Sequence, residues 1–451
     1  RNGLINAPLL VLKNLKDVDN QGGEISSAQA FTLTAQNLDN SNNGKLISNQ
    51  GLTLRIEQLL ASVKGLISAQ SVDVKSARLD NSGGLITSRG TLGVTVGGQL
   101  VNQGGTLIAD DELNLKADSV DNSEGHIAGK ADVIANVATL NNQHGELVAT
   151  AGLKLTGNSL DNRNGGLVGA NDALQLTVDA VDNRGGELSS QADVTLLGSR
   201  LDNSDGGKLI AQGALTLTVD EVLNRAKGLL SGKTDLTLTG RSLDSTAGAL
   251  LSQSNLKLDL SGDLNNSQGL ISAEGSLGVT AASLTNNLGS LSVAGPLTLT
   301  TTGVVLNRGG QIVTDASLNL TSASLDNSNG GSLSAKGAMV VQTGTLDNSH
   351  NGKLNSGDTL DLKATQLTNQ DGGRIASNAA LTANVTGLDQ QGGQLFSNTS
   401  LDLDLNHGQL NNQNGLIGAP LLMLKNLQDV NNDGGEISST QAFTVTARSL
   451  D

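Results

Sequence analysis

Cysteine, tryptophan and tyrosine are absent from this chain of 451 residues, which has only three phenylalanines, three prolines and four histidines. Without cysteine the chain has no disulfide bond, no thiolate metal site and no cysteine nucleophile. The shortage of aromatic rings is unusual for a globular core, because large rings fill irregular interiors. A core of Leu, Val, Ile and Ala instead suits a thin, regular interior built from many similar layers.

Basic residues are also scarce: 28 Lys and Arg stand against 43 Asp and Glu, which gives a net charge of −15. Nucleic-acid binding needs a basic face, so we expect no nucleic-acid partner. No apolar run approaches the length of a membrane-spanning helix, so we expect no membrane insertion. Hydrophobic residues still make up 37% of the chain, and with 57 glycines the apolar share is that of a folded protein.

A tripeptide of an aliphatic residue, then Asp or Asn, then Asn recurs along the chain, as in Leu160-Asp161-Asn162. Degenerate copies fill the gaps, including Leu243-Asp244-Ser245, Leu388-Asp389-Gln390 and, in our alignment, Leu59-Leu60-Ala61. The 22 copies are spaced by 20, 21 or 22 residues. Because the series has no gap, we expect one continuous repeat array over residues 1–451 without a domain boundary.

Each unit continues with a Gly-Gly or Asn-Gly turn, a Leu, a polar corner and alternating apolar residues such as Leu174, Leu176 and Val178. Alternation is the period of a half-buried strand, and the glycine-rich segments supply positive φ at turns. No stretch keeps the period of a helix. Two or three short strands cannot bury their leucines alone, so units must stack in register, about 4.8 Å apart. The sequence therefore predicts an all-β parallel β-helix, or β-solenoid, of about 21 coils with a 20–22-residue repeat.

Asparagine fills the third tripeptide position in 18 of the 21 units where that position lies inside the chain. A merely solvated turn would accept Ser, Gly or Asp as well. We therefore predict that these asparagines are structural and form a ladder of side-chain amides along the coils. The predicted ladder consists of Asn20, Asn40, Asn81, Asn102, Asn122, Asn142, Asn162, Asn183, Asn203, Asn224, Asn266, Asn286, Asn307, Asn327, Asn348, Asn369, Asn412 and Asn432.

The first and last 39 residues are near copies of each other. Residues 1–39 and 413–451 are identical at 29 of 39 positions, and rare residues recur, such as Pro8 with Pro420. We infer that a block of about 20 coils was duplicated and that the chain is a segment of a longer protein. Insertion of a whole block is tolerated best in a shaft, where length is the useful property.

The unit LDN-x-x-GG-x-LI-x-x-x-x-L-x-LTA resembles the filamentous haemagglutinin repeat of bacterial two-partner secretion exoproteins, which include filamentous adhesins and contact-dependent growth inhibition effectors. Ile25-Ser26-Ser27 and Leu209-Ile210-Ala211 fit its first strand, and Leu52-Thr53-Leu54 fits its second. The resemblance covers essentially the whole chain. It implies a right-handed β-helix on the outer surface of a Gram-negative bacterium, secreted through an outer-membrane partner transporter. The lack of cysteine suits passage of an unfolded chain.

The resemblance leaves two functions open. In the first, the chain is a structural shaft that projects distal receptor-binding or toxin domains toward a receptor on a target cell, as in contact-dependent growth inhibition. In the alternative, the chain is a filamentous adhesin whose lateral faces bind host or bacterial surfaces directly. Contacts with the transporter and the receptor would be made by parts outside this segment.

We predict no enzyme activity, no catalytic residue, no metal site and no cofactor. The alternative is a Ca²⁺ site in which Asp161, Asp182 and Asp202, at one position of three consecutive units, form a row of carboxylates. Against it, these side chains would point outward at a corner, where Arg163 and Arg184 partly compensate them.

The remaining candidates for a functional site are the histidines and phenylalanines, which are rare in this chain. The four histidines fall at different coil positions and do not converge; they are His126, His144, His350 and His407. The three phenylalanines, Phe31, Phe396 and Phe443, lie in or beside strands, and we expect them to pack rather than bind a ligand.

Overall fold

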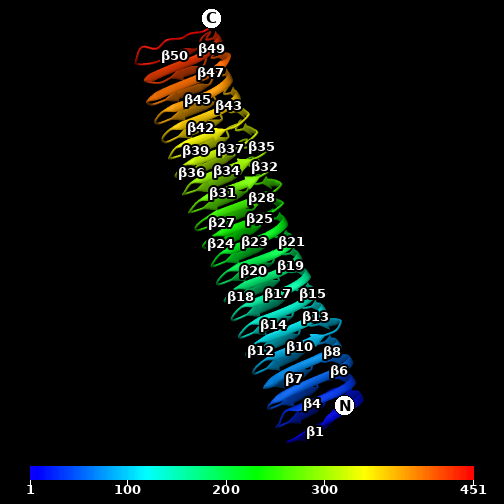
Figure 1. Cartoon of the computed structure of the whole chain (residues 1–451). Coiled ribbons are helices and arrows are strands. Elements are labelled where there is room, and N and C mark those ends of the chain that lie inside the picture. Colours follow the sequence, from blue (N-terminus) through cyan, green and yellow to red (C-terminus); the bar gives the residue numbers. More distant parts are fainter. The chain divides into compact units, whose positions relative to one another are not determined.

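The computed structural model describes residues 1–451, which form strands β1 to β51 and no helix, so nothing helical is long enough to span a membrane. The chain forms two compact units, Arg1–Val222 with Gly228–Gly232 and Leu223–Lys227 with Lys233–Asp451. Both units consist of stacked coils of about 21 residues (Figure 1). The predicted all-β parallel β-solenoid is thus confirmed.

Coils of the first unit contain a short strand and a long strand. The short strands are β1 (Leu4–Ala7), β3 (Glu24–Ser27), β5 (Lys45–Ser48), β7 (Leu66–Ala69), β9 (Leu85–Ser88), β12 (Thr106–Ala109), β14 (His126–Gly129), β16 (Glu146–Ala149), β18 (Leu167–Ala170), β20 (Glu187–Ser190), β22 (Lys208–Ala211) and β24 (Leu229–Gly232). The long strands, one of them divided into β10 and β11, are β2 (Leu12–Asp19), β4 (Phe31–Asp39), β6 (Gly51–Ala61), β8 (Ser71–Asp80), β10 (Leu92–Val96), β11 (Gln99–Val101), β13 (Leu113–Asp121), β15 (Val133–Asn141), β17 (Leu153–Asp161), β19 (Leu174–Asp182), β21 (Val194–Asp202) and β23 (Leu215–Leu223).

In the second unit the long strand is more often divided at a bend, so that coils with two strands and coils with three both occur, as predicted. Its short strands are β27 (Ala249–Ser252), β30 (Leu270–Ala273), β33 (Ser290–Val293), β36 (Gln311–Thr314), β39 (Ser332–Ala335), β42 (Lys353–Ser356), β44 (Arg374–Ser377), β46 (Gln394–Ser397), β48 (Leu416–Gly418) and β50 (Glu436–Ser438). Its other strands are β25 (Leu236–Gly240), β26 (Ser242–Asp244), β28 (Leu256–Leu260), β29 (Asp263–Asn265), β31 (Leu277–Ala281), β32 (Ser283–Thr285), β34 (Leu297–Thr301), β35 (Val304–Leu306), β37 (Leu318–Thr321), β38 (Ser324–Asp326), β40 (Met339–Gln342), β41 (Thr345–Asp347), β43 (Leu360–Thr368), β45 (Leu381–Asp389), β47 (Ser400–Asn411), β49 (Leu421–Asn431) and β51 (Ser449–Leu450).

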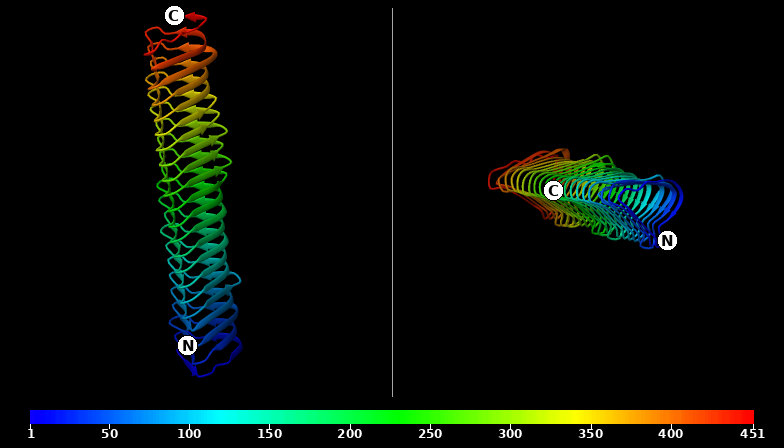
Figure 2. Two further views of the ribbon diagram at one scale, coloured as in Figure 1. Left: turned by 60° about the vertical axis from the view of Figure 1, so that its left-hand side comes forward. Right: turned by 90° about the horizontal axis from the view of Figure 1, so that it is seen from below.

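Each strand pairs in parallel with its counterparts in the neighbouring coils. β20 pairs with β18 and β22, and β21 pairs with β19, always with equivalent residues opposite each other. Within a unit the short strands therefore form one parallel sheet and the long strands form a second one (Figure 2). The core lies between these sheets.

Aliphatic side chains stack in columns inside the coils. Leu188, Leu209 and Leu230 lie opposite one another in β20, β22 and β24, and none of them is exposed. In β19 the buried residues alternate with exposed ones along the strand, as the sequence predicted. Burial of one leucine side chain is worth about 1.5–3 kcal/mol, so these columns stabilise the stack of coils.

The strand register corrects the position that the sequence predicted for one copy of the tripeptide. Leu38 in β4 pairs with Leu60 in β6, and Leu60 pairs with Leu79 in β8, so the copy is Leu60-Ala61-Ser62 and not Leu59-Leu60-Ala61. A bulge in β6 between Ile56 and Leu59 accommodates the extra residue. The two adjoining intervals are consequently 22 and 19 residues, and the shorter one falls outside the predicted range.

Candidate functional site

The third residue of the tripeptide is buried in the corner that follows the long strand. Asn142 has no exposed surface; its Oδ1 accepts a hydrogen bond from Nδ2 of Asn122 at 2.8 Å, and its Nδ2 donates to Oδ1 of Asn162 at 2.8 Å. The same Nδ2 donates to the carbonyl oxygen of Leu167 at 3.0 Å. Both ends of this buried amide therefore have partners in the neighbouring coils, as a buried polar group requires.

The same bond, with N···O distances of 2.6–2.8 Å, recurs along both units. In the first unit it runs from Asn20 to Asn40 and through Asn81, Asn102, Asn122, Asn142, Asn162, Asn183 and Asn203. In the second it runs through Asn266, Asn286, Asn307, Asn327, Asn348 and Asn369 and from Asn412 to Asn432. In every case the lower-numbered residue donates and the higher-numbered residue accepts.

Ser62, Ser245 and Gln390 occupy the ladder position in the three coils without asparagine. Asn40 and Asn224 donate to the hydroxyls of Ser62 and Ser245 at 3.3 and 3.2 Å. Asn369 donates to Gln390 at 2.8 Å, but Nε2 of Gln390 turns to the carbonyl oxygen of Leu416. After each interruption one buried oxygen lacks a hydrogen-bond donor; these are the Oδ1 atoms of Asn81, Asn266 and Asn412.

A glycine packs against each ladder amide, and its role was not predicted correctly. A Cβ atom added to Gly105 would lie 2.2 Å from the carbonyl oxygen of Asn81 and 2.7 Å from Oδ1 of Asn102. Gly104, immediately before it, has φ of +57° and open space around it. Only the first glycine thus serves the turn by its positive φ. The second permits close approach of two coils, which its recurrence three or four residues after the asparagine could have indicated.

The aspartates considered for Ca²⁺ face arginines instead. Arg163 contacts Asp161 at 2.8 Å and lies 3.5 Å from Asp182, while Arg184 contacts Asp182 at 2.7 Å and lies 3.9 Å from Asp202. Oδ1 of Asp161 also accepts the backbone N–H of Arg163, which closes the turn. Asp161 and Asp182 are thus partly exposed and compensated by arginines, whereas Asp202 is buried, with Arg200 at 3.5 Å. Nowhere do three or more His, Cys, Asp or Glu side chains come together to hold a metal ion.

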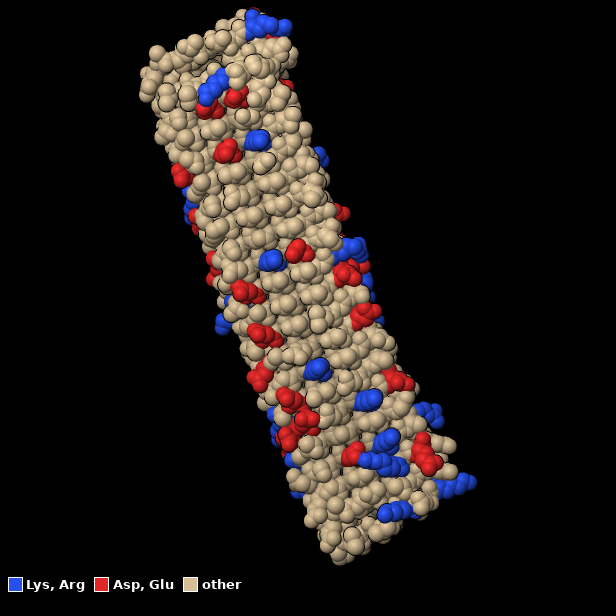
Figure 3. Space-filling view, in the orientation of Figure 1, with Lys and Arg blue, Asp and Glu red and all other residues tan.

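The electrostatics of this row stabilise the ionised carboxylates. Burial raises the pKa of Asp182, but hydrogen bonds from Arg184 and the charges of Arg184 and Arg163 outweigh it, so the pKa lies below its usual 3.8. The hydrogen bond and charge of Asp182 in turn raise the pKa of Arg184. Elsewhere on the face seen in Figure 3, acidic and basic side chains are scattered among wide neutral areas.

The histidines do not form a site. His126 pairs with Glu146 at 2.8 Å, and His350 lies 3.5 Å from Asp371. His144 and His350 share one kind of turn, with φ of 55° and 53°, so the prediction of four different coil positions is wrong for this pair. The two residues nevertheless belong to coils far apart in the stack and are exposed.

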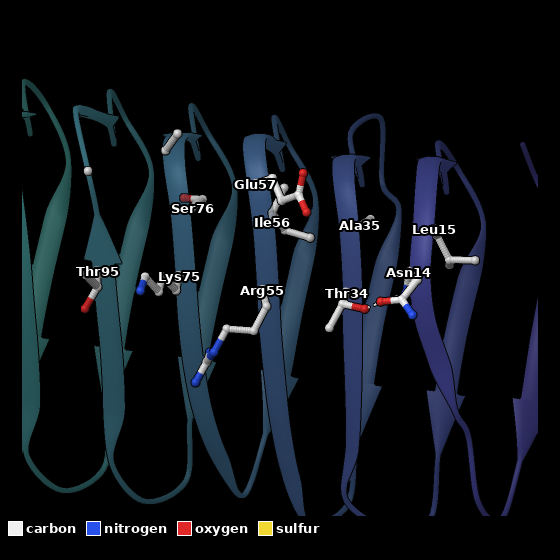
Figure 4. Close-up of a pocket in the computed structure, with 12 residues that line it drawn as sticks. Asn14, Leu15, Thr34, Ala35, Arg55, Ile56, Glu57, Lys75, Ser76 and Thr95 are labelled. Atoms are coloured by element: carbon white, nitrogen blue, oxygen red, sulfur yellow. Dashed lines mark hydrogen bonds between the residues drawn. The ribbon is translucent and has the colours of Figure 1, made fainter.

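The first unit has a surface groove of about 590 Å³ where the long strands bend (Figure 4). Leu15, Ala35 and Ile56 contribute apolar walls, and the strand bulge after Ile56 lies at the groove. Lys75 and Glu57, which belong to no ion pair, also line it, whereas the neighbouring Arg55 pairs with Asp73. No sequence period marks this groove, because irregular pairing in β2 and β6 interrupts the repeat there.

Comparison with known families agrees with this geometry. The family model of the haemagglutinin repeat matches residues 11–58, 58–104, 94–157, 144–219, 206–303, 272–364 and 344–451. The chain belongs to the haemagglutinin repeat family. No curated protein and no solved structure matches it. The haemagglutinin repeat is a structural, adhesin-type unit, and the resemblance inferred from the tripeptide is confirmed.

Proposed function

We propose that the chain is the shaft of a secreted cell-surface exoprotein and that it projects distal receptor-binding or toxin domains from the cell. The observation that supports this most directly is the repetition of one coil plan through both units, with stacked aliphatic side chains and amides in its interior. Such a plan can be extended by about 4.8 Å per coil without altering the coils already present. We further propose that the coils form one continuous array.

The proposed route to the surface follows from family membership. Exoproteins with this repeat are secreted by two-partner systems, so we propose export through an outer-membrane transporter of a Gram-negative bacterium. The absence of cysteine supports this proposal, because no disulfide can form before the chain is threaded. Toxin delivery of the contact-dependent growth inhibition type is one use of such a shaft.

Removal of whole coils from the exoprotein tests the shaft. Deletion of residues 121–160 joins Val120 to Asp161, removes two coils and keeps the tripeptide intact. We expect reach, measured by electron microscopy on cells, to fall by about 10 Å while affinity for the target is unchanged. The control replaces the same residues with residues 285–325, two coils of different surface. Loss of binding in both variants would contradict a passive shaft.

The alternative function, direct adhesion by a lateral face, is favoured by the groove at Ile56. It combines apolar walls with the unpaired Lys75 and Glu57 at its edge. Exchange of the two charges in the double variant Lys75→Glu, Glu57→Lys leaves the net charge and the coil number unchanged. A loss of cell adherence in this variant, with reach preserved, would favour adhesion over the shaft.

A further inference from the structure

Phe396 differs from the buried Phe31 because its ring stands on the outer face of the short-strand sheet. It is half-buried, and in β46 it lies between the inward-facing Leu395 and Ser397. One face of the ring is covered by Arg374 of the preceding coil, whose Cζ lies 4.4 Å from the ring centroid. This face of the ring thus packs against a side chain of the neighbouring coil, and that side chain is a cation.

The other face of the ring borders a cavity. In the following coil the residue paired with Phe396 is Gly418, which has no side chain to cover the ring. A cavity of about 470 Å³ lies there, lined by Phe396, Gly418, Pro420 and Glu436. Because Arg374 and Gly418 belong to the coils on opposite sides of Phe396, the ring separates the guanidinium from the cavity.

Several polar side chains at the cavity can accept hydrogen bonds. Glu436 is exposed in β50 and belongs to no ion pair. The hydroxyls of Ser439 and Thr440 both donate to the carbonyl oxygen of Pro420, at 2.9 and 3.2 Å. Oγ of Ser439 also accepts the backbone N–H of Gln441 at 3.2 Å, so the oxygen lone pairs offered to the cavity are chiefly those of Thr440. A guanidinium group carries only donors and a positive charge, and it stacks on aromatic faces. The net charge of −15 favours such a ligand over an anion.

We propose that this cavity binds the guanidinium group of an arginine side chain from a partner protein. The arginine would stack on the free face of Phe396 and pair with Glu436, so that the ring is held between two guanidinium groups. This gives the lateral surface of the second unit a specific contact site, independent of whether the chain acts as a shaft.

The near copy at the start of the chain supplies a matched variant. Asn6 stands there where the second copy has Gly418, and its Nδ2 donates to Oγ of Ser26 at 2.8 Å. The corresponding partner of Gly418 is Ser438. The substitution Gly418→Asn therefore places in the cavity a side chain that the equivalent coil at the start of the chain already carries, and we expect the variant to fold.

The experiment uses the whole chain with ¹³C-labelled phenylalanine rings, which gives signals from only three residues. The variant Phe396→Leu assigns the Phe396 signal. On addition of N-acetyl-arginine amide we expect that signal to shift and saturate while the Phe31 signal stays in place. We expect Glu436→Gln to weaken binding about two- to fivefold and Gly418→Asn to abolish the saturable shift.

N-acetyl-norleucine amide and methyl pyranosides serve as neutral probes, for which we expect no saturable shift. The proposal is overturned if the arginine probe gives no saturation up to about 100 mM, well above the millimolar range of weak binding. It is also overturned if Gly418→Asn binds like the native chain, or if a pyranoside saturates the Phe396 signal and the arginine probe does not, which would identify a sugar site.

Discussion

Ser62 and Asn81 occupy equivalent positions in neighbouring coils, yet no hydrogen bond joins their side chains. The serine hydroxyl accepts from Asn40 at 3.3 Å, and Oδ1 of Asn81 is left buried without a donor. A buried oxygen without a partner costs about 1–3 kcal/mol. The interruption is thus a local weakness that a longer amide side chain at position 62 can remove.

We expect Ser62→Asn to raise the free energy of unfolding by about 1–2 kcal/mol, because its amide can accept from Asn40 and donate to Asn81. Urea denaturation followed by circular dichroism measures this change. The control is Ser71→Asn on the outer face of β8, which we expect to change stability by less than about 0.5 kcal/mol. Equal effects of the two substitutions would refute the ladder as the cause.

Removal of a ladder residue has the opposite effect. Asn142→Ala deprives Asn122 of its acceptor and Asn162 of its donor, so we expect a loss of about 2–4 kcal/mol. Asn136→Ala, at an exposed position of the same coil, is the control and is expected to be nearly neutral. Hydrogen exchange would locate the loss, since amides of β15 and β17 are expected to lose protection first.

The adjacent glycines Gly104 and Gly105 have different roles: Gly104 adopts the positive φ of the turn, and Gly105 allows the close contact between coils. Gly104→Ala places a side chain at φ of +57° in open space, which costs about 1–2 kcal/mol. Gly105→Ala forces a methyl group to 2.2 Å from the carbonyl oxygen of Asn81, so we expect a larger loss, or failure to fold. The measurement is the midpoint of thermal unfolding of each variant, which we expect to be lower for Gly105→Ala than for Gly104→Ala. If Gly104→Ala were the less stable variant, close approach of the coils would be refuted as the reason for Gly105.

The row of aspartates and arginines predicts that the stability of the folded chain depends on pH. The pKa of Asp182 is lowered in the folded chain, so its contribution to stability is present above pH 3.8 and is lost as the pH falls through the folded-state value. We therefore expect Arg184→Gln to be less stable than the native chain at pH 7, by no more than about 1 kcal/mol because the pair is partly exposed. The difference should vanish in acid.

Arg78→Gln serves as the control for Arg184→Gln, because Arg78 is exposed and belongs to no ion pair. Its stability difference from the native chain should not depend on pH. We also expect 1 M NaCl to reduce the effect of Arg184→Gln, since salt screens pairs at the surface. An effect of Arg184→Gln that persisted at pH 2 would indicate lost packing by the arginine stem and not lost charge.

Features that repeat in every coil could be predicted from the sequence, because twenty copies of a weak signal reinforce one another. The alternating strands, the stacked leucines and the positions of the asparagines that the structure brings together belong to this class. The groove at Ile56 and the open face of Phe396 each occur at one place in the stack, where the coils depart from the repeat, so the period of the sequence did not predict them. The bulge in β6 likewise displaced one tripeptide by a residue.

The amide ladder has a polarity, because every rung points its N–H toward the higher-numbered coil. A chain that folds coil by coil from its amino terminus would therefore end, after each coil with a ladder asparagine, in an unpaired amide N–H, which the oxygen of the next ladder residue satisfies. Each completed turn is a template of the same shape for its successor. Assembly can then proceed by repeated local addition, like growth on a crystal face, whatever the final number of turns.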